Sequence, residues 1–169
     1  MSRPRKSGRG FRVSHDYATE NPGADPTATE LVVNLLLTAA LLEGKLEGVL
    51  RQSKLTVGSL NAMQVITGDA EPLTPSEVSR RMTLPVTTAT MTGILDTLER
   101  NAYIERRRHP TDRRRVNLHL TAEGRRVIDD VIPRVLEHEK VWTAALNKAE
   151  RKKVTDDLAR LTEHLRETE

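Results

Sequence analysis

The chain has 169 residues, a net charge of +3 at pH 7, no cysteine, and only one phenylalanine, two tyrosines and one tryptophan. The lack of cysteine excludes disulfides, thiolate redox sites and zinc fingers, and a reducing cytosol is the expected location. The scarcity of aromatic rings argues against single-stranded nucleic acid or RNA binding, which uses exposed rings to stack bases. The length suits one domain, or one domain with an appended helical region.

The positive charge is concentrated in two segments. Residues 99–115 contain seven arginines and three acidic residues, and residues 1–12 contain five basic residues and no acidic one. The rest of the chain is therefore acidic. Such an asymmetry indicates a polyanionic partner, although a basic tail can also serve solubility alone.

The N-terminal part predicts an arm followed by a long helix. Residues 1–25 are basic and then rich in Gly, Pro, Asn and Asp, which predicts disorder. A helix is expected over Pro26–Gln52, with apolar residues on most of its circumference. Such a helix must be buried on most sides, and a second copy of the chain is the expected cover. Its longest apolar stretch, Leu31–Leu42, is shorter than the roughly twenty residues of a bilayer span, so we expect no membrane association.

Three helices are expected next, over Val57–Thr67, Thr74–Met82 and Val86–Arg100. The second has a strong start, because Thr74 can cap it, Pro75 suits the first helical position and Glu77 completes a capping box. The third has an inward face at helical spacing, made of Met91, Ile94, Leu95 and Leu98. Two helices joined by the short turn at Thr83-Leu84-Pro85 form a helix-turn-helix.

Two strands and two helices complete the chain. The strands are expected at Ile104–Arg108 and Val116–Leu120, around a Pro-Thr-Asp turn, with Val116, Leu118 and Leu120 inward and Asn117 and His119 outward. Thr121 should cap a helix that Pro133 kinks, and a last helix from about Lys148 carries a coiled-coil-like seam. The fold class is therefore mainly α with a small β-hairpin.

Four pieces of this pattern carry a family resemblance. They are the capped helix Thr74–Met82, the segment Thr90–Arg100, the hairpin His109-Pro110-Thr111-Asp112-Arg113-Arg114-Arg115, and the exit Leu118-His119-Leu120-Thr121-Ala122-Glu123-Gly124. Together they resemble the MarR family of winged helix-turn-helix transcription regulators over about fifty residues. One departure is Ala102, where the family usually has glycine, and we expect Asn101 to take the left-handed conformation instead.

The resemblance implies a ligand-responsive regulator. It implies a homodimer formed through the N- and C-terminal helices. The dimer would bind a palindromic DNA operator, usually to repress transcription, and a small phenolic or lipophilic effector would release it from DNA. The expected organisation is an arm (1–25), a dimerisation helix (26–55), a winged helix-turn-helix (56–121) and C-terminal dimerisation helices (122–169). A pocket between the first helix and the DNA-binding lobe would be lined by Leu42, Leu46, Leu60, Met63 and Gln64, which are equally good core residues.

The recognition helix and the wing are the predicted DNA contacts. The exposed start of the helix offers Thr87, Thr88, Ala89, Thr90, Thr92 and Gly93, which predicts a phosphate at its N-terminal amides and modest readout through thymine methyls. The alternative is that these threonines serve capping and packing. In the wing, Arg113 or Arg114 is expected in a minor groove, and the resemblance implies that Asp112 pairs with an arginine, favouring Arg114. Arg106, Arg108 and Arg115 would contact phosphates.

Other functions find little support in the sequence. The five histidines lack metal-ligand spacing, and no catalytic motif occurs, so we expect no metal, no cofactor and no enzyme activity. Two alternatives remain: an architectural winged-helix protein without an effector, and a ligand-binding or interaction module that has lost DNA binding. Preference for a discrete DNA sequence would distinguish a regulator from an architectural protein. The arginine-rich wing argues against a module that has lost DNA binding.

Overall fold

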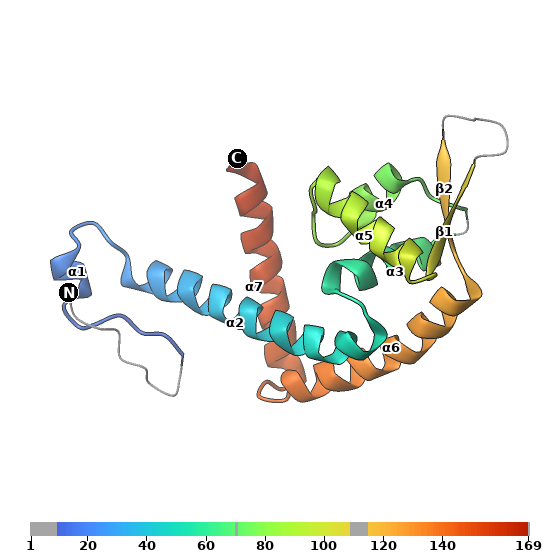
Figure 1. Cartoon of the computed structure of the whole chain (residues 1–169). Helices are drawn as coiled ribbons and strands as arrows, with labels where there is room; N and C mark the ends of the chain where they lie inside the picture. Colours follow the sequence, from blue (N-terminus) through green and yellow to red (C-terminus); the bar gives the residue numbers. More distant parts are fainter. Residues whose placement is uncertain (1–9, 70, 109–114, 169) are drawn as a thin grey trace. The chain divides into compact units, whose positions relative to one another are not determined.

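A computed structural model describes residues 10–69, 71–108 and 115–168, which form two compact units. The first unit spans Met1–Gly48 and the second spans Val49–Glu169 (Figure 1). The first contains α1 (Tyr17–Glu20) and most of α2 (Pro26–Leu50). The second contains the 3-10 turn η1 (Arg51–Ser53), α3 (Val57–Gly68), α4 (Pro75–Arg81), α5 (Thr88–Arg100), β1 (Ile104–Arg108), β2 (Val116–Leu120), α6 (Ala122–Trp142) and α7 (Lys148–Glu167).

The predicted disorder of residues 1–25 is wrong for the described start of this segment, where Phe11, Arg12 and Val13 are hydrogen-bonded to α2. The Asn34 side chain accepts a hydrogen bond from the Phe11 backbone N–H at 2.8 Å and donates to the Phe11 carbonyl at 3.0 Å. One turn earlier, Glu30 accepts from the Val13 N–H and pairs with Arg12, both at 3.0 Å. Composition alone could not reveal these partners, because they lie about twenty residues away in sequence.

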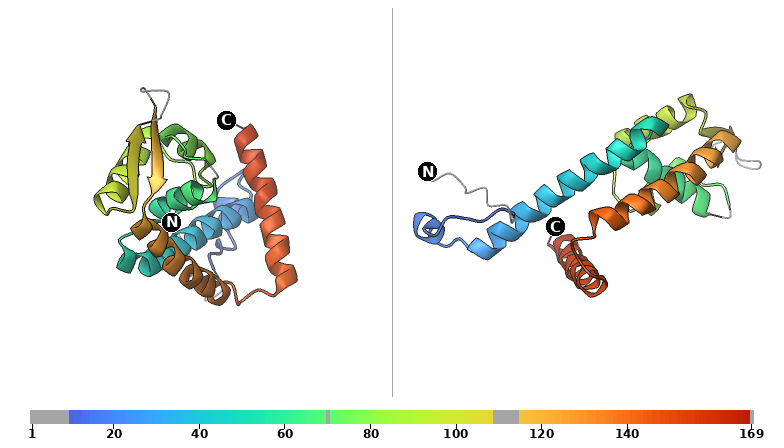
Figure 2. Two further views of the ribbon diagram at one scale, coloured as in Figure 1. Left: turned by 90° about the vertical axis from the view of Figure 1, so that its right-hand side faces the viewer. Right: turned by 90° about the horizontal axis from the view of Figure 1, so that it is seen from below.

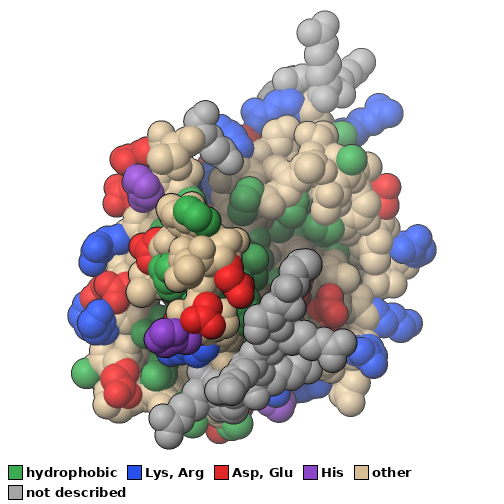
Figure 3. Space-filling view, turned by 90° about the vertical axis from the view of Figure 1, so that its left-hand side faces the viewer, with side chains coloured by type: hydrophobic (Ala, Val, Ile, Leu, Met, Phe, Trp, Pro, Cys, Tyr) green, Lys and Arg blue, Asp and Glu red, His purple; other side chains and the backbone are tan. Residues whose placement is uncertain are grey.

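Much of α2 displays apolar side chains. Its exposed large residues are Leu31, Val32, Leu36, Leu37, Leu41 and Leu42, and its buried residues are Val49 and Leu50 at the C-terminal end. Hydrophobic side chains also reach the surface of the face drawn in Figure 3. Within the described residues, the segment Pro26–Ser53 is long and apolar enough to cross a membrane by length and composition, contrary to our expectation from its longest apolar run. A helix that a partner covers in solution meets the same criteria, so this is weak support for a membrane span.

Polar side chains fix where the helices of the second unit begin. Thr56, Thr74, Thr87 and Thr121 cap α3, α4, α5 and α6, each accepting a hydrogen bond from a backbone N–H of the first turn. The capping box between Thr74 and Glu77 is present as predicted. Because Thr87 is the cap, α5 starts at Thr88 rather than at Val86. These side chains satisfy amides that the helix itself cannot pair.

The core of the second unit lies between the helix-turn-helix and the hairpin. Leu50, Met63, Val78, Leu95, Leu98, Ile104, Leu118 and Val131 are its largest fully buried side chains. The strands pair antiparallel with Ile104 opposite Leu120, and they lie against α3, α4 and α5 (Figure 2, left). The Leu118 N–H also donates to the Leu73 carbonyl at 2.8 Å, which ties the hairpin to the entry of α4.

The predicted inward and outward faces of β2 are partly wrong. Asn117 is buried and Val116 is exposed, whereas Leu118 is buried as expected. Alternation fails because β2 contacts helices α3, α4 and α6 and is covered on more than one face. The Asn117 side-chain oxygen is buried without a hydrogen-bond partner among the described residues.

The end of α5 also differs from the prediction. Ala102 itself takes the left-handed conformation, with φ of 58°, and Asn101 stays at φ −82°. The Tyr103 N–H donates to the Leu98 carbonyl and the Ala102 N–H to that of Glu99, both at 2.9 Å, which is a Schellman motif with Ala102 at its left-handed position. The motif places Tyr103 so that its hydroxyl donates to the Ser53 carbonyl at 3.0 Å.

The C-terminal helices pack unequally. In α6, Ile128, Val131 and Val135 are buried, and the helix continues through Pro133. Near its end, the rings of His138 and Trp142 stack with centroids 5.5 Å apart. Among the described residues of α7 none is buried, although the helix carries Val154, Leu158 and Leu165.

Candidate nucleic-acid interface

The recognition helix α5 has one buried and one open face. Met91, Leu95 and Leu98 are buried and Ile94 is half-buried, close to the predicted inner face. The predicted contact residues Thr87, Thr88, Ala89, Thr90, Thr92 and Gly93 are all exposed at the N-terminal end. A Cβ added to Gly93 would meet no atom within 4 Å, so nothing in the described structure fills the space beside it. The helix therefore presents small side chains to any approaching partner.

Hydrogen bonds within α5 use most of these threonine hydroxyls. Thr87 accepts from the Thr90 N–H at 3.2 Å, and its hydroxyl lies 2.9 Å from that of Thr90. Thr92 donates to the Thr88 carbonyl at 3.0 Å. The capping alternative raised by the sequence is therefore part of what these residues do. The methyl groups of Thr90 and Thr92 take no part in these hydrogen bonds.

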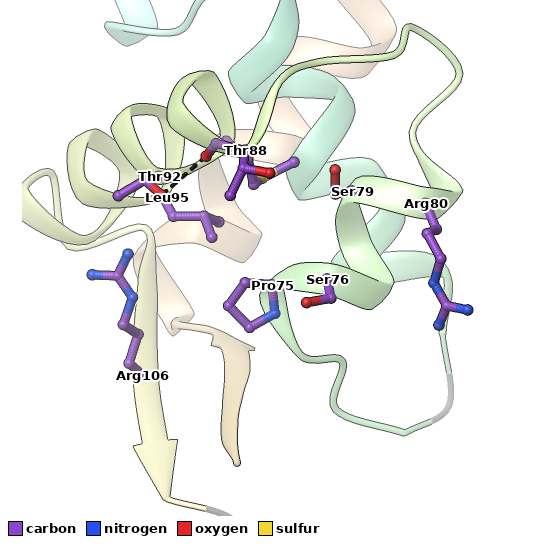
Figure 4. Close-up of a pocket in the computed structure, with 9 residues that line it drawn as sticks. Pro75, Ser76, Ser79, Arg80, Thr88, Thr92, Leu95 and Arg106 are labelled. Carbon is purple, nitrogen blue, oxygen red and sulfur yellow. Dashed lines mark hydrogen bonds between the residues drawn. The ribbon is translucent and has the colours of Figure 1, made fainter. Parts of the chain in front are cut away.

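A hollow of about 250 Å³ opens between α4, α5 and β1. Figure 4 shows Pro75, Ser76, Ser79 and Arg80 on the side of α4, with Thr88, Thr92 and Leu95 facing them from α5. Arg106 enters from β1. Ser76, Ser79 and Arg80 were not among the predicted site residues, because serines and arginines at the surface of a short helix ordinarily have no binding role.

Arg106 is bound to the recognition helix. Its guanidinium contacts Glu99 at 2.5 Å and Asp96 at 2.7 Å, and its backbone N–H donates to Glu99 at 3.3 Å. Burial lowers the pKa of Arg106, but the hydrogen bond to Asp96 and the charges of Glu99 and Asp96 outweigh this and raise it. The acids Asp96 and Glu99 were missed as partners, although their spacing of three residues puts them on one helix face.

The remaining described arginines of the hairpin differ in their partners. Arg107 pairs with Glu105, and Arg115 pairs with Glu77 of α4 at 3.1 Å. Arg108 is exposed at the end of β1, opposite Val116 in the strand register, and its side chain has no hydrogen-bond or ion-pair partner within the described part of the chain. The predicted wing residues Asp112, Arg113 and Arg114 lie outside the described residues.

Glu77 combines capping with an ion pair. The hydroxyl of Thr74 donates to the Glu77 carboxylate at 2.7 Å, and so does the Thr74 backbone N–H. These hydrogen bonds, in that order, lower the pKa of Glu77, and the charge of Arg115 adds to the effect. Asn61 of α3 supports the following turn, where it accepts from the Thr83 N–H at 3.1 Å.

The predicted effector pocket is divided between the two units. Leu60 and Met63 are buried core residues of the second unit, and Gln64 is exposed. Leu42 is exposed and Leu46 half-buried in the first unit. Their joint role as a pocket stays a prediction. Among the residues that the structure describes, no three His, Asp or Glu side chains gather as a metal site would require.

Comparison with known proteins decides the family. The MarR family profile matches residues 66–116, which run from the end of α3 to the start of β2 and contain α4, α5 and β1. The chain belongs to the MarR family. It is thus a DNA-binding transcription regulator and not an enzyme.

Relatives and solved structures agree with this MarR assignment. The transcriptional repressor YetL of Bacillus subtilis is 28% identical over 120 residues, covering 70% of each chain. A MarR-like regulator from Bacillus cereus has the same fold, with a TM-score of 0.72 at 21% identity over 82% of this chain and 98% of that one. Bordetella bronchiseptica BpsR, whose DNA binding is regulated by 6-hydroxynicotinic acid, follows with a TM-score of 0.67 at 21% identity over 76% and 89%.

Proposed function

We propose that this MarR-family protein is a cytoplasmic repressor that binds a palindromic operator as a homodimer and leaves it when a small effector binds. The observation that carries the proposal is the exposed start of α5 beside a hairpin rich in arginine. The hairpin offers guanidinium groups for phosphates, and the open helix face offers a surface that fits a major groove. The name of YetL as a repressor supports the sign of regulation.

The homodimer would cover the exposed apolar residues. Leu36 is 66% exposed and Leu41 58% exposed on α2, and Leu158 and Leu165 are exposed on α7. Apolar surface of this extent is unfavourable in water and is normally buried against another chain. A second copy is the simplest cover, because DNA readers of this type bind half-sites about 34 Å apart through a twofold axis.

Readout of bases would depend on methyl contacts and on the wing. The start of α5 lacks Arg, Lys, Asn and Gln, the side chains that make the most discriminating base contacts. Thr88, Thr92 and Ala89 would therefore contact thymine methyls, and Gly93 would allow a close approach. Arg113 of the wing would enter the minor groove and sense its width.

The effector would be a small aromatic or lipophilic molecule. The regulation of BpsR by 6-hydroxynicotinic acid supports this chemistry. Leu42, Leu46, Leu60, Met63 and Gln64 remain the proposed lining of its pocket. A thermal-shift screen of phenolic and aromatic acids, followed by DNA-release assays with each hit, tests this part of the proposal.

Footprinting of the purified protein on DNA selected from a randomised library tests the operator. A discrete inverted repeat is the expected result, whereas broad protection would favour an architectural protein. Arg113→Ala should weaken binding on the order of tenfold or more, because a minor-groove guanidinium contributes both charge and fit. Thr88→Ala and Thr92→Ala should give smaller losses. Wild-type affinity in Arg113→Ala would refute the wing assignment.

A further inference from the structure

Arg106 is the most constrained of the described hairpin arginines. Its side chain is 29% exposed, against 60% for Arg107 and 46% for Arg115. It lies opposite Leu118 in the strand register, and Leu118 is fully buried. Figure 4 shows its guanidinium reaching from β1 toward α5. Arg106 therefore sits on the side of the hairpin that faces the recognition helix.

Two guanidinium N–H groups of Arg106 and its backbone N–H already have acceptors. Separate guanidinium nitrogens donate to Glu99 and Asp96, and the backbone N–H donates to the second oxygen of Glu99. A phosphate could bind these two N–H groups only by displacing a carboxylate. Charge-assisted hydrogen bonds of this kind are among the strongest in proteins. Their geometry is fixed by a planar guanidinium that lysine cannot imitate.

Asp96 gives this contact a second consequence. It follows Gly93 by three residues and is exposed on the recognition helix. An unpaired carboxylate there would repel the phosphates of an approaching duplex. The contact at 2.7 Å with Arg106 offsets this charge and at the same time joins α5 to β1.

We propose that Arg106 is a positioning residue that holds the wing at a fixed orientation to the recognition helix, so that both elements fit one operator half-site. It would not contact phosphate, contrary to the prediction from the sequence. This inference rests on the proposed DNA-binding function. Arg108, two residues along the same strand, provides the contrast, because its side chain is exposed and has no hydrogen-bond or ion-pair partner among the described residues.

The test compares Arg106→Lys, Arg106→Met and Arg108→Met. Binding of each variant is measured over a range of salt, to the duplex selected by the wild-type protein and to a scrambled duplex of equal length. Loss of a phosphate contact lowers the salt slope by about 0.9 per contact and weakens both duplexes alike. We expect this behaviour from Arg108→Met.

For Arg106→Met we expect a different signature. Affinity for the selected duplex should fall on the order of tenfold, affinity for the scrambled duplex should change much less, and the salt slope should stay near that of the wild type. Arg106→Lys should resemble Arg106→Met. Lysine keeps the positive charge, but it cannot hold Asp96 and Glu99 at the same time in the geometry of the planar guanidinium. In combination with Asp96→Asn, the Arg106→Met loss should be smaller than the sum of the single effects.

Three outcomes would overturn the inference. The first is an Arg106→Met variant with a reduced salt slope and an unchanged preference for the selected duplex. The second is an Arg106→Lys variant that binds like the wild type while Arg106→Met is impaired. The third is wild-type binding by both variants. Circular dichroism and thermal melting identify variants that fail to fold. If the Arg106 variants fail to fold, the less disruptive Asp96→Asn variant, which removes one of the two carboxylate partners, provides the same test. A wild-type protein that binds neither duplex would refute the proposed function instead.

Discussion

Helices α2 and α5 both carry aliphatic residues at helical spacing, but only α5 buries them within its own chain. Met91, Leu95 and Leu98 form one stripe that closes against the helix-turn-helix core. In α2, by contrast, most large apolar residues from Leu31 to Leu42 are exposed, and buried residues occur only at its C-terminal end. A helix with apolar residues on one side can be buried by its own chain, whereas a helix that is apolar on most sides requires a second chain to cover it.

Leu36→Asp is the strongest test of this comparison. If α2 is covered by a second copy, a carboxylate at this position would be buried without a partner and should separate the protomers. Operator affinity should then fall about 100-fold or more, because two linked half-site contacts become one. Light scattering after gel filtration gives the oligomeric state.

The matched control for Leu36→Asp is Ala28→Asp in the first turn of α2, where a carboxylate suits the helix dipole. This variant should stay dimeric. A wild-type protein that is already monomeric at micromolar concentration would contradict the comparison, as would a dimeric Leu36→Asp.

Two glycines sharpen the comparison inside the second unit. A Cβ at Gly124 would lie 2.0 Å from the Tyr103 carbonyl oxygen, so Gly124→Ala should destabilise the fold by about 1–3 kcal/mol. Gly93→Ala meets open space and should stabilise the free protein by up to about 1 kcal/mol, since alanine favours helix. Urea denaturation measures both.

The same Gly93→Ala variant should bind the operator less tightly if the open side of α5 approaches base edges. Higher stability with lower affinity would show that this glycine serves DNA and not the fold. Equal or tighter binding would remove Gly93 from the interface.

Much of the second unit could be predicted because its signals are local. The strands Ile104–Arg108 and Val116–Leu120 were placed at the bounds that the structure shows, and the capping residues Thr74 and Thr121 were identified from neighbours within a few positions. The exit motif Leu118–Gly124 ends in glycine for a physical reason, because a Cβ at Gly124 would collide with the Tyr103 carbonyl.

Several of the errors have a different cause, because they depend on partners on other elements of the chain. Asn117 is buried by helices on more than one side of β2, and Phe11 is held by Asn34. Arg106 has the composition of a phosphate contact, but it pairs with two acids on another element. No local pattern distinguishes these cases from exposed residues.

Ala102→Gly should give a moderate gain in stability. Alanine in the left-handed conformation carries a steric cost that glycine avoids, and the added flexibility of glycine in the unfolded chain offsets part of it. We expect a net gain of about 0.5–1 kcal/mol in urea denaturation, with unchanged operator affinity. A loss of stability would contradict the steric cost that we assign to alanine in the left-handed conformation at this position.

Glu77→Gln should have the smallest effect, visible as a change in pH dependence. The folded-state pKa of Glu77 lies below its ordinary value of 4.5 because of the hydrogen bonds from Thr74. Its contribution to stability is therefore present above about pH 4.5 and is lost as the pH falls through the lower folded-state value. Thermal melts at pH 3 to 7 should show a shallower acid dependence in the variant, and an identical profile would contradict the assignment.

The stacked pair at the end of α6 makes the protein its own spectroscopic probe. Trp142 is the only tryptophan in the chain, so tryptophan fluorescence arises at the turn between α6 and α7. Its indole stacks on the His138 imidazole, with the ring centroids 5.5 Å apart. Subunit association or effector binding near this turn can thus be followed by emission alone, without any attached label.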